Sequence, residues 1–102
     1  LDPVVQRLAT EKAQEMADRG YFDHVSPTYG TPVQMMQQAG VQARLLGGEN
    51  IGKASDVARV HAMFMASQGH RANVLRPDYT HVGVGVAPDG HGVVVSEMFI
   101  GR

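Results

Sequence analysis

The stretch HVGVGVAPDGHGVVVSEMFI, residues 81–100, decides the fold class of this chain. Valine alternates with glycine over residues 81–87, and a period of two is the pattern of a β-strand. The segment PDGHG is rich in turn formers and precedes a second apolar run, so we predict a β-hairpin whose second strand covers residues 93–100. Gly83 and Gly85 leave one face of the first strand nearly bare, which predicts the close approach of another element, such as a helix.

Three segments ahead of the hairpin have the residue spacing of helices. The first covers residues 2–20, begins with an Asp-Pro capping sequence and ends at a glycine. The second covers residues 31–40 and begins with a capping box from Thr31 to Gln34, and the third covers residues 55–69 with Ser55 as its cap. We expect a further turn or two of helix over residues 70–75, which Pro77 then stops. Because the helices precede the strands, we predict an α+β fold with helices covering a small antiparallel sheet. The largely apolar stripe of the first helix comprises Val5, Leu8, Ala9, Lys12, Ala13, Met16 and Ala17.

The composition is that of an ordinary globular protein and excludes several classes of function. The chain has 102 residues, 43% hydrophobic and 19% charged, enough for one domain over residues 1–102. The net charge is −1 and the basic residues are scattered, which argues against a nucleic-acid or anionic-membrane partner. No apolar run approaches the roughly 20 residues of a transmembrane helix, and the absence of cysteine excludes disulfides and thiolate sites. Because the chain starts at Leu1 rather than Met, we expect a processed product or an excised domain. We also expect a monomer.

Three residues are candidates for chemistry, and each has a simpler structural explanation. His24 lies in the predicted loop FDHVSP, where a histidine is often only solvated. Glu49 lies in GGENIGK (residues 47–53), which we predict to be a loop, and its carboxylate could cap the amides of a nearby turn. His70 follows a glycine where the third helix breaks, so it could be a C-terminal cap.

The segment SQGHRANVL (residues 67–75) contains further polar candidates. Ser67 and His70 are three residues apart and could form a nucleophile–base pair, which also needs a third group to orient the base. The simpler explanation is that Ser67 is a small residue that packs on the apolar face of its helix. We expect Arg71 and Asn73 to be structural and to hold loops by hydrogen bonds. None of the five histidines forms an HExxH or other local metal-binding pattern.

Taken together, these motifs resemble the CAP superfamily, also called SCP or cysteine-rich secretory, antigen 5 and pathogenesis-related-1 domains, and in particular its cysteine-free bacterial branch. The motifs that carry the resemblance occur in family order between His24 and Phe99. They are HVSP with Pro32 after it, GGENIG, SQGHRANVL, HVGVGVA and a strand ending in EMF. The resemblance implies a three-layer α-β-α sandwich, an exported domain, and a cleft with two histidines and two acidic residues that binds a divalent cation such as zinc.

The resemblance assigns His24, Glu49 and His70 to that cleft, where they are metal ligands and candidate catalytic residues. The second acidic residue is missing, because Gln34 and Met35 stand where it is expected. Two imidazoles and one carboxylate can hold zinc with an open position, but losing a carboxylate weakens binding and leaves acid–base chemistry to Glu49 or a histidine. Gln34, Ser67, Arg71 and Asn73 are then supporting residues around the site, and Gln34 could accept a hydrogen bond from a histidine or a bound water.

The missing acid favours a binding function over catalysis. We expect a secreted or cell-envelope binding module whose cleft holds a lipid, glycan or peptide ligand and weakly binds a divalent cation. The alternative is a hydrolase of peptide or cell-wall material that uses a metal-bound water or a His/Glu pair. A third possibility is a structural adhesion domain with a vestigial site. We also expect the helix that carries His70 to lie against the bare glycine face of the hairpin.

Overall fold

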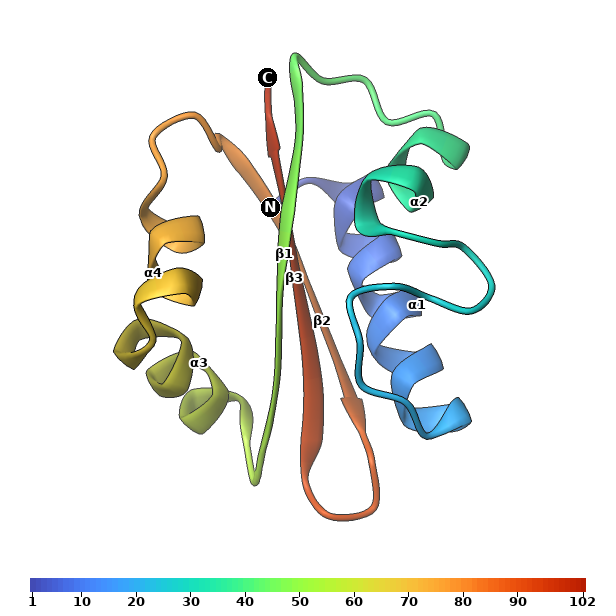
Figure 1. Ribbon diagram of the computed structural model, residues 1–102, viewed down its shortest axis with the longest axis vertical. Helices are drawn as coiled ribbons and strands as arrows, with labels where there is room; N and C mark the ends of the chain where they lie inside the picture. The colour runs from blue at the N-terminus through green and yellow to red at the C-terminus, as the bar shows by residue number, and fades with distance from the viewer.

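A three-stranded antiparallel sheet lies between two layers of helices in the computed structural model, which describes residues 1–102 (Figure 1). The strands are β1 (Leu45–Ala54), β2 (His81–Pro88) and β3 (Val93–Gly101), in the spatial order β1-β3-β2. Helices α1 and α2 cover one face of the sheet, and α3 and α4 cover the other (Figure 1). The arrangement confirms the α+β fold class and the α-β-α sandwich.

The first two helices begin and end where the capping residues predict. In front of α1 (Pro3–Arg19), the Asp2 carboxylate accepts hydrogen bonds from the amides of Val4 and Val5, both at 3.0 Å. Gly20 ends the helix with a left-handed φ of 68°, which glycine adopts without steric cost. In front of α2 (Pro32–Gln38), the predicted capping box forms in both directions, as described below for Gln34.

The predicted third helix corresponds to α3 (Val57–Ala66), and the further turns expected over residues 70–75 belong to α4 (Gln68–Leu75). The prediction was wrong about the cap, because Asp56 rather than Ser55 accepts a hydrogen bond from the Arg59 amide at 2.8 Å. It was also wrong about the length of the helix. The backbone of Ser67 is extended, with φ −97° and ψ 124°, so α3 ends there and α4 starts in a new direction. His70 therefore lies inside α4 and not at the end of α3.

The segment GGENIGK, predicted to be a loop, is part of β1. Its residues pair with β3 from Leu45 opposite Gly101 to Ala54 opposite Val93, with an irregularity between Leu46 and Glu49. Glycine-rich sequences have little strand preference of their own. The strand forms here because β3 is apolar and buried and offers a free edge for antiparallel pairing.

The bare glycine face of the hairpin contacts α1, and the expectation that the His70 helix lies there was wrong. A Cβ at Gly83 would lie 2.3 Å from the Val5 carbonyl, and one at Gly85 would lie 2.0 Å from the Ala9 carbonyl oxygen. Only glycine lets the backbones of α1 and β2 approach so closely. The first helix also satisfies the outer edge of β2, because the Gln6 side-chain amide donates to the Val84 carbonyl at 2.6 Å and accepts from its N–H at 2.7 Å.

The apolar core lies mainly between α1, α2 and the sheet, and a smaller cluster lies under α3. The fully buried side chains on the α1 side include the charged Lys12, within the apolar stripe. None of the helices has the length and apolar character needed to cross a membrane. The larger buried apolar residues are Val5, Leu8, Met16, Met35, Met36, Ile51, Val94, Met98 and Ile100 on the α1 side, and Val60, Phe64, Val95 and Phe99 on the other.

Candidate functional site

The loop between α1 and α2 carries His24, and several hydrogen bonds fix it to α1. Ser26 pairs with Gly30 through two backbone hydrogen bonds, which close the loop, and its hydroxyl donates to the Glu15 carboxylate at 2.5 Å. The His24 carbonyl accepts a hydrogen bond of 2.6 Å from the Lys12 ammonium. The loop therefore holds the His24 ring beside β1, with its side chain 51% exposed.

Glu15 is the anchor of this loop and has a perturbed pKa. Burial alone would raise the Glu15 pKa, but hydrogen bonds donated by Ser26 and Tyr21 outweigh it and hold the pKa below its ordinary value. The same hydrogen bond shifts the pKa of Tyr21 in the opposite direction. Burial and the hydrogen bond to the Glu15 carboxylate raise the pKa of the Tyr21 hydroxyl far above its ordinary value.

Glu49 is the centre of the candidate site and is fully buried. Its Oε1 accepts from the Lys12 ammonium at 3.0 Å and from Nδ1 of His24 at 3.0 Å. Its Oε2 accepts from Lys12 at 3.2 Å and from the Ser96 hydroxyl at 2.6 Å. Both carboxylate oxygens thus have two donors each, and an adjacent ammonium neutralises the charge.

The contact with Glu49 also fixes the tautomer of His24. A carboxylate next to an ammonium acts as an acceptor, so Nδ1 of His24 is the donor of the 3.0 Å bond. The Nε2 atom makes no hydrogen bond within the chain and lies on the half-exposed side of the ring. His24 therefore presents one free nitrogen to a ligand, and a buried carboxylate orients the ring.

Lys12 is the residue of this site that our sequence analysis did not identify. Its side chain is 1% exposed, and it ties α1, the His24 loop and β1 together through three hydrogen bonds. A signal was present in the sequence, since a lone lysine occupies an otherwise apolar helical stripe. Lysine is almost never fully buried unless it is paired, so that position should have predicted a buried acidic partner.

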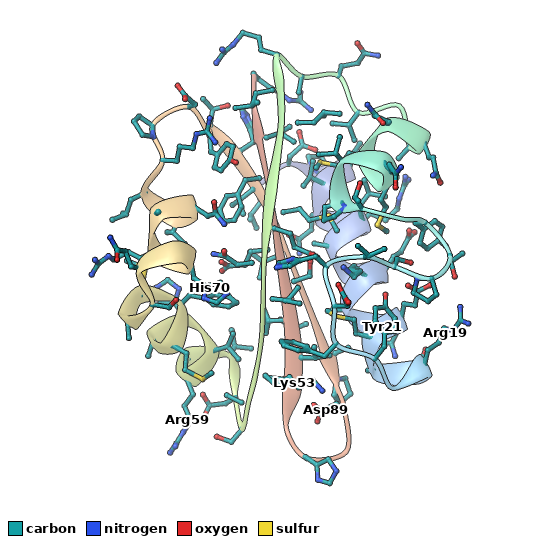
Figure 2. All side chains as sticks on the ribbon, viewed as in Figure 1. Arg19, Tyr21, Lys53, Arg59, His70 and Asp89 are labelled. Carbon is teal, nitrogen blue, oxygen red and sulfur yellow. The ribbon has the colours of Figure 1, made fainter.

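His70 does not join His24 and Glu49 in the structure. It projects from α4, in the layer on the opposite side of the sheet from Tyr21 and α1, and its ring lies 5.0 Å from that of Phe64 (Figure 2). Its backbone carbonyl accepts a hydrogen bond of 3.1 Å from the buried side chain of Asn50, which docks α4 onto β1.

The residues present do not fit a bound zinc ion in this arrangement. No group of three or more histidine, cysteine, aspartate or glutamate side chains lies close enough together to hold a metal. The Glu49 oxygens are occupied by four donated hydrogen bonds, and the Lys12 ammonium would repel a cation there. The metal-ligand roles of His24, Glu49 and His70 stay predictions.

The supporting residues predicted from the sequence make different contacts in the structure. Asn73 is structural as expected, and it donates to the Asn50 side chain at 2.9 Å. Arg71 lies exposed and its side chain makes no hydrogen bond, so its expected role in holding a loop was wrong. The side-chain oxygen Oε1 of Gln34 accepts a hydrogen bond of 2.9 Å from the Thr31 N–H, so it caps the helix and does not point into the cleft. Ser67 is half-buried and its hydroxyl makes no hydrogen bond to His70.

A shallow cleft of about 280 Å³ opens over the edge of β1 at the His24–Glu49 pair. Its walls come from the α1–α2 loop, the start of α2, the edge strand β1 and helix α4. Most of the atoms exposed in the cleft are carbon, and His24, Asn73 and the glycine backbone supply its hydrogen-bonding groups. The lining residues are His24, Pro32, Val33, Gly47, Gly48, Glu49 and Asn73.

The α-β-α sandwich is the architecture that the HVSP, GGENIG and GHRANVL motifs predicted for an SCP domain. The chain belongs to the CAP, or cysteine-rich secretory protein, family, whose model matches residues 1–100. In this chain the sandwich forms without any cysteine.

Two relatives from Bacillus subtilis (strain 168) are similar to this chain. The uncharacterized protein YkwD is 41% identical over 103 residues, which cover 100% of this chain and 39% of YkwD. The uncharacterized membrane protein YlbC is 34% identical over 86 residues, which cover 83% of this chain and 25% of YlbC. The chain therefore spans well under half the length of the curated relatives that it matches.

Two solved structures share the fold. One is an extracellular protein containing an SCP domain from Bacillus anthracis str. Ames, with a TM-score of 0.88 and 33% identity over 99% of this chain and 33% of that one. The other is an outer surface protein from Borrelia burgdorferi, with a TM-score of 0.80 over 99% of this chain and 75% of that one. At 16% identity, the second likeness shows the fold alone.

Proposed function

We propose that this domain is a non-catalytic binding module that acts outside the cytoplasm, and that the His24 cleft takes a glycan or peptide ligand. The extracellular SCP protein of Bacillus anthracis, which shares the fold at 33% identity, supports the location. The cleft combines the hydrogen-bonding groups of His24, Asn73 and the glycine backbone with exposed carbon surface, and this mixture supports a glycan or peptide ligand, which carries both kinds of group.

The saturation of Glu49 is the observation that carries this proposal. A general base needs a free lone pair within reach of the proton that it removes, and both Glu49 oxygens already accept two hydrogen bonds each. The ammonium of Lys12, 3.0 Å from Oε1, occupies part of the carboxylate. What remains for a ligand is Nε2 of His24, the Asn73 side chain and the exposed backbone of the β1 edge, all of which suit hydrogen-bonded binding.

The alternative function is a hydrolase that uses the His24–Glu49 pair. The 3.0 Å hydrogen bond from Nδ1 to Glu49 is the observation in its favour, because a carboxylate that orients an imidazole leaves the other nitrogen free to act as a base toward water. A nucleophilic serine is not available to this pair, since the Ser96 hydroxyl is buried and donates to Glu49. Catalysis would therefore rest on His24 and a water molecule.

One experiment tests binding and turnover together. Soluble muropeptides, which contain both glycan and peptide, are titrated into ¹⁵N-labelled protein, and the same samples are then analysed by mass spectrometry for cleavage products. The variants are His24→Ala and, as the matched control, His61→Ala, which removes an exposed histidine on α3 far from the cleft.

We expect saturable shifts of the Gly47, Gly48 and Asn73 amides in the parent protein and in His61→Ala, a large loss of affinity in His24→Ala, and no products. Products that disappear in His24→Ala would replace the binding proposal with the hydrolase. Unshifted cleft amides would reject wall-derived glycans and peptides as ligands of this cleft.

A further inference from the structure

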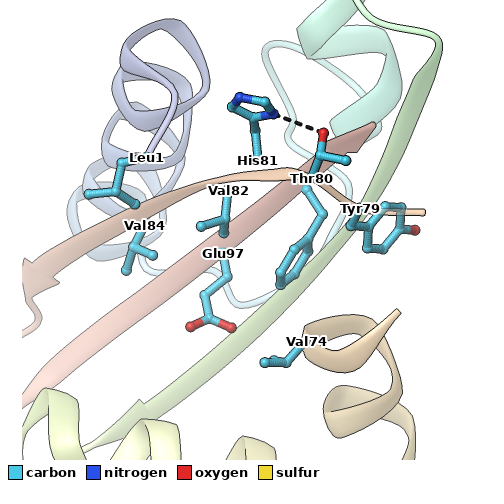
Figure 3. A pocket seen from close by; sticks show the side chains of 9 residues that line it. Leu1, Val74, Tyr79, Thr80, His81, Val82, Val84 and Glu97 are labelled. Atoms are coloured by element: carbon cyan, nitrogen blue, oxygen red, sulfur yellow. Dashed lines mark hydrogen bonds between the residues drawn. The ribbon is translucent and has the colours of Figure 1, made fainter. Parts of the chain in front are cut away.

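A second cavity, of about 250 Å³, lies on the other side of the sheet and shares no residue with the His24 cleft (Figure 3). It opens beside β2, which is the edge strand opposite β1. Helices α3 and α4 lie over β1 and β3 and leave this part of the sheet uncovered. The lining residues are Leu1, Val74, Tyr79, Thr80, His81, Val82, Val84, Glu97 and Phe99.

Six of the nine residues that line this cavity are hydrophobic, and they form its apolar part. Val82 and Val84 project from β2, Phe99 projects from β3 and stacks on Tyr79 at 5.3 Å, and Val74 projects from α4. The two polar groups at the rim are paired with one another, because the Thr80 hydroxyl lies 2.8 Å from Nδ1 of His81 (Figure 3). The walls therefore suit a short apolar group.

A single carboxylate lies among these walls. Glu97 projects from the central strand β3 into the space between the sheet and Val74 (Figure 3), and the residue is only 9% exposed. Its Oε1 accepts one hydrogen bond, at 3.3 Å, from the Asn50 side chain. Its Oε2 has no hydrogen-bond partner in the chain. Every fully buried side-chain oxygen of this protein has such a partner, so Oε2 is not fully buried and faces the cavity that Glu97 lines.

No cation of the chain pairs with Glu97. All other strongly buried acidic side chains have one, since Asp2 lies against Arg102 and Glu49 against Lys12, whereas no lysine, arginine or histidine nitrogen lies within 4.0 Å of Glu97. A carboxylate taken out of water without a counter-charge is unfavourable, and a cation that enters the cavity would relieve that cost.

We propose that this cavity binds a primary ammonium group carried on a short apolar stem. The carboxylate supplies the charge, and the valines and Phe99 supply the surface for the stem. An ammonium fits better than a guanidinium. Only one oxygen of Glu97 is free, and a guanidinium gains most from a carboxylate that offers both oxygens. This proposal is independent of the function proposed for the His24 cleft.

The test uses n-pentylammonium as the probe and 1-pentanol as its uncharged counterpart, each titrated into ¹⁵N-labelled protein. We expect pentylammonium to shift the amides of Val82, Val84 and Phe99 saturably, to bind more weakly as salt is added, and to bind more tightly than pentanol or n-pentylguanidinium. Glu97→Gln keeps the size of the side chain and an acceptor for Asn50. It should weaken pentylammonium binding at least about tenfold and leave pentanol unchanged.

Two further variants keep the result interpretable. Glu11→Gln removes an exposed carboxylate of α1 and should leave binding unchanged. Val74→Phe fills the cavity and leaves residue 97 a glutamate, so it should abolish pentylammonium binding even if Glu97→Gln fails to fold. The proposal is overturned if the cavity amides do not shift with pentylammonium. It is equally overturned if pentanol binds as tightly as pentylammonium, or if binding survives in folded Glu97→Gln or in Val74→Phe.

Discussion

Lys12 and Glu49 form an ion pair inside the protein, with Nζ 3.0 Å from Oε1 and the two side chains 1% and 0% exposed. The pair joins α1 to β1 across the core and also holds the His24 loop through its carbonyl. Charges this deeply buried are costly to take out of water, and a pair of them persists only when each charge has its partner and its hydrogen bonds. Here the carboxylate has four donors and the ammonium has three acceptor contacts.

Replacing Lys12 alone should therefore be strongly destabilising. Lys12→Met keeps the apolar stem but leaves the Glu49 carboxylate buried without its cation, which costs about 3–5 kcal/mol of unfolding free energy. Urea unfolding measures the loss. The double variant Lys12→Met/Glu49→Gln removes both charges and should recover part of it. Arg7→Ala, which breaks the exposed Arg7–Glu11 pair on the same helix, should cost less than about 1 kcal/mol. A Lys12→Met variant as stable as Arg7→Ala would show that Glu49 does not depend on the lysine.

The close contact between α1 and the glycine face of β2 gives a second prediction. A methyl group at Gly85 would lie 2.0 Å from the Ala9 carbonyl oxygen, which is backbone and cannot rotate away. Gly85→Ala should therefore lower the unfolding free energy by at least the roughly 1–3 kcal/mol typical of overpacking. Gly69→Ala is the matched control. This glycine lies in α4 with open space around it, so alanine should stabilise the protein by about 0.5–1 kcal/mol. Equal stability of the two variants would contradict the packing described here.

The separation of His70 from the cleft gives a third prediction, which concerns zinc. Calorimetric titration of the metal-free protein should show only weak zinc binding, because one free imidazole nitrogen and a neutralised carboxylate are a poor ligand set. His24→Ala should reduce this binding further, and His70→Ala should leave it unchanged. Saturable one-to-one binding that is lost in both variants would mean that His70 moves into the cleft and that the predicted three-residue site forms.

The Tyr21–Glu15 contact predicts how stability depends on alkaline pH. Burial and the Glu15 carboxylate raise the Tyr21 pKa in the folded protein, so folding favours the protonated hydroxyl. This contribution is fully present below the unfolded tyrosine pKa near 10 and is lost as the pH rises above that value. Tyr21→Phe should cost about 1 kcal/mol at pH 8 through the lost hydrogen bond.

Urea unfolding of the parent protein and of Tyr21→Phe between pH 8 and 11 measures this effect. Groups that titrate in both proteins cancel in the comparison, so the difference between the two curves isolates Tyr21. We expect that difference to shrink above pH 10. Tyr29→Phe, which removes a hydroxyl that makes no hydrogen bond, is the control and should show a difference that does not change with pH. A constant difference for Tyr21→Phe would contradict the raised pKa.

The local elements of this protein could be predicted from the sequence because their signals lie within a few residues of one another. Asp2 and Gly20 bound the first helix, and Thr31 with Gln34 caps the second, since each cap is satisfied by backbone a few residues away. The alternation of valine and glycine identified β2 for the same reason. The family resemblance then added the third layer, which no local pattern contains.

Tertiary structure decided how these elements meet. Gly83 and Gly85 predicted that a backbone comes close but not which one, and the structure selected α1 rather than the helix of His70. The glycine-rich segment around Glu49 has no strand pattern, and β1 exists because β3 offers its edge for pairing. The lysine in the apolar stripe and the glutamate among glycines lie 37 positions apart, and only the fold brings them together. Capping energies depend on neighbours in the chain, whereas the partners of a buried charge and of a bare strand face depend on long-range packing.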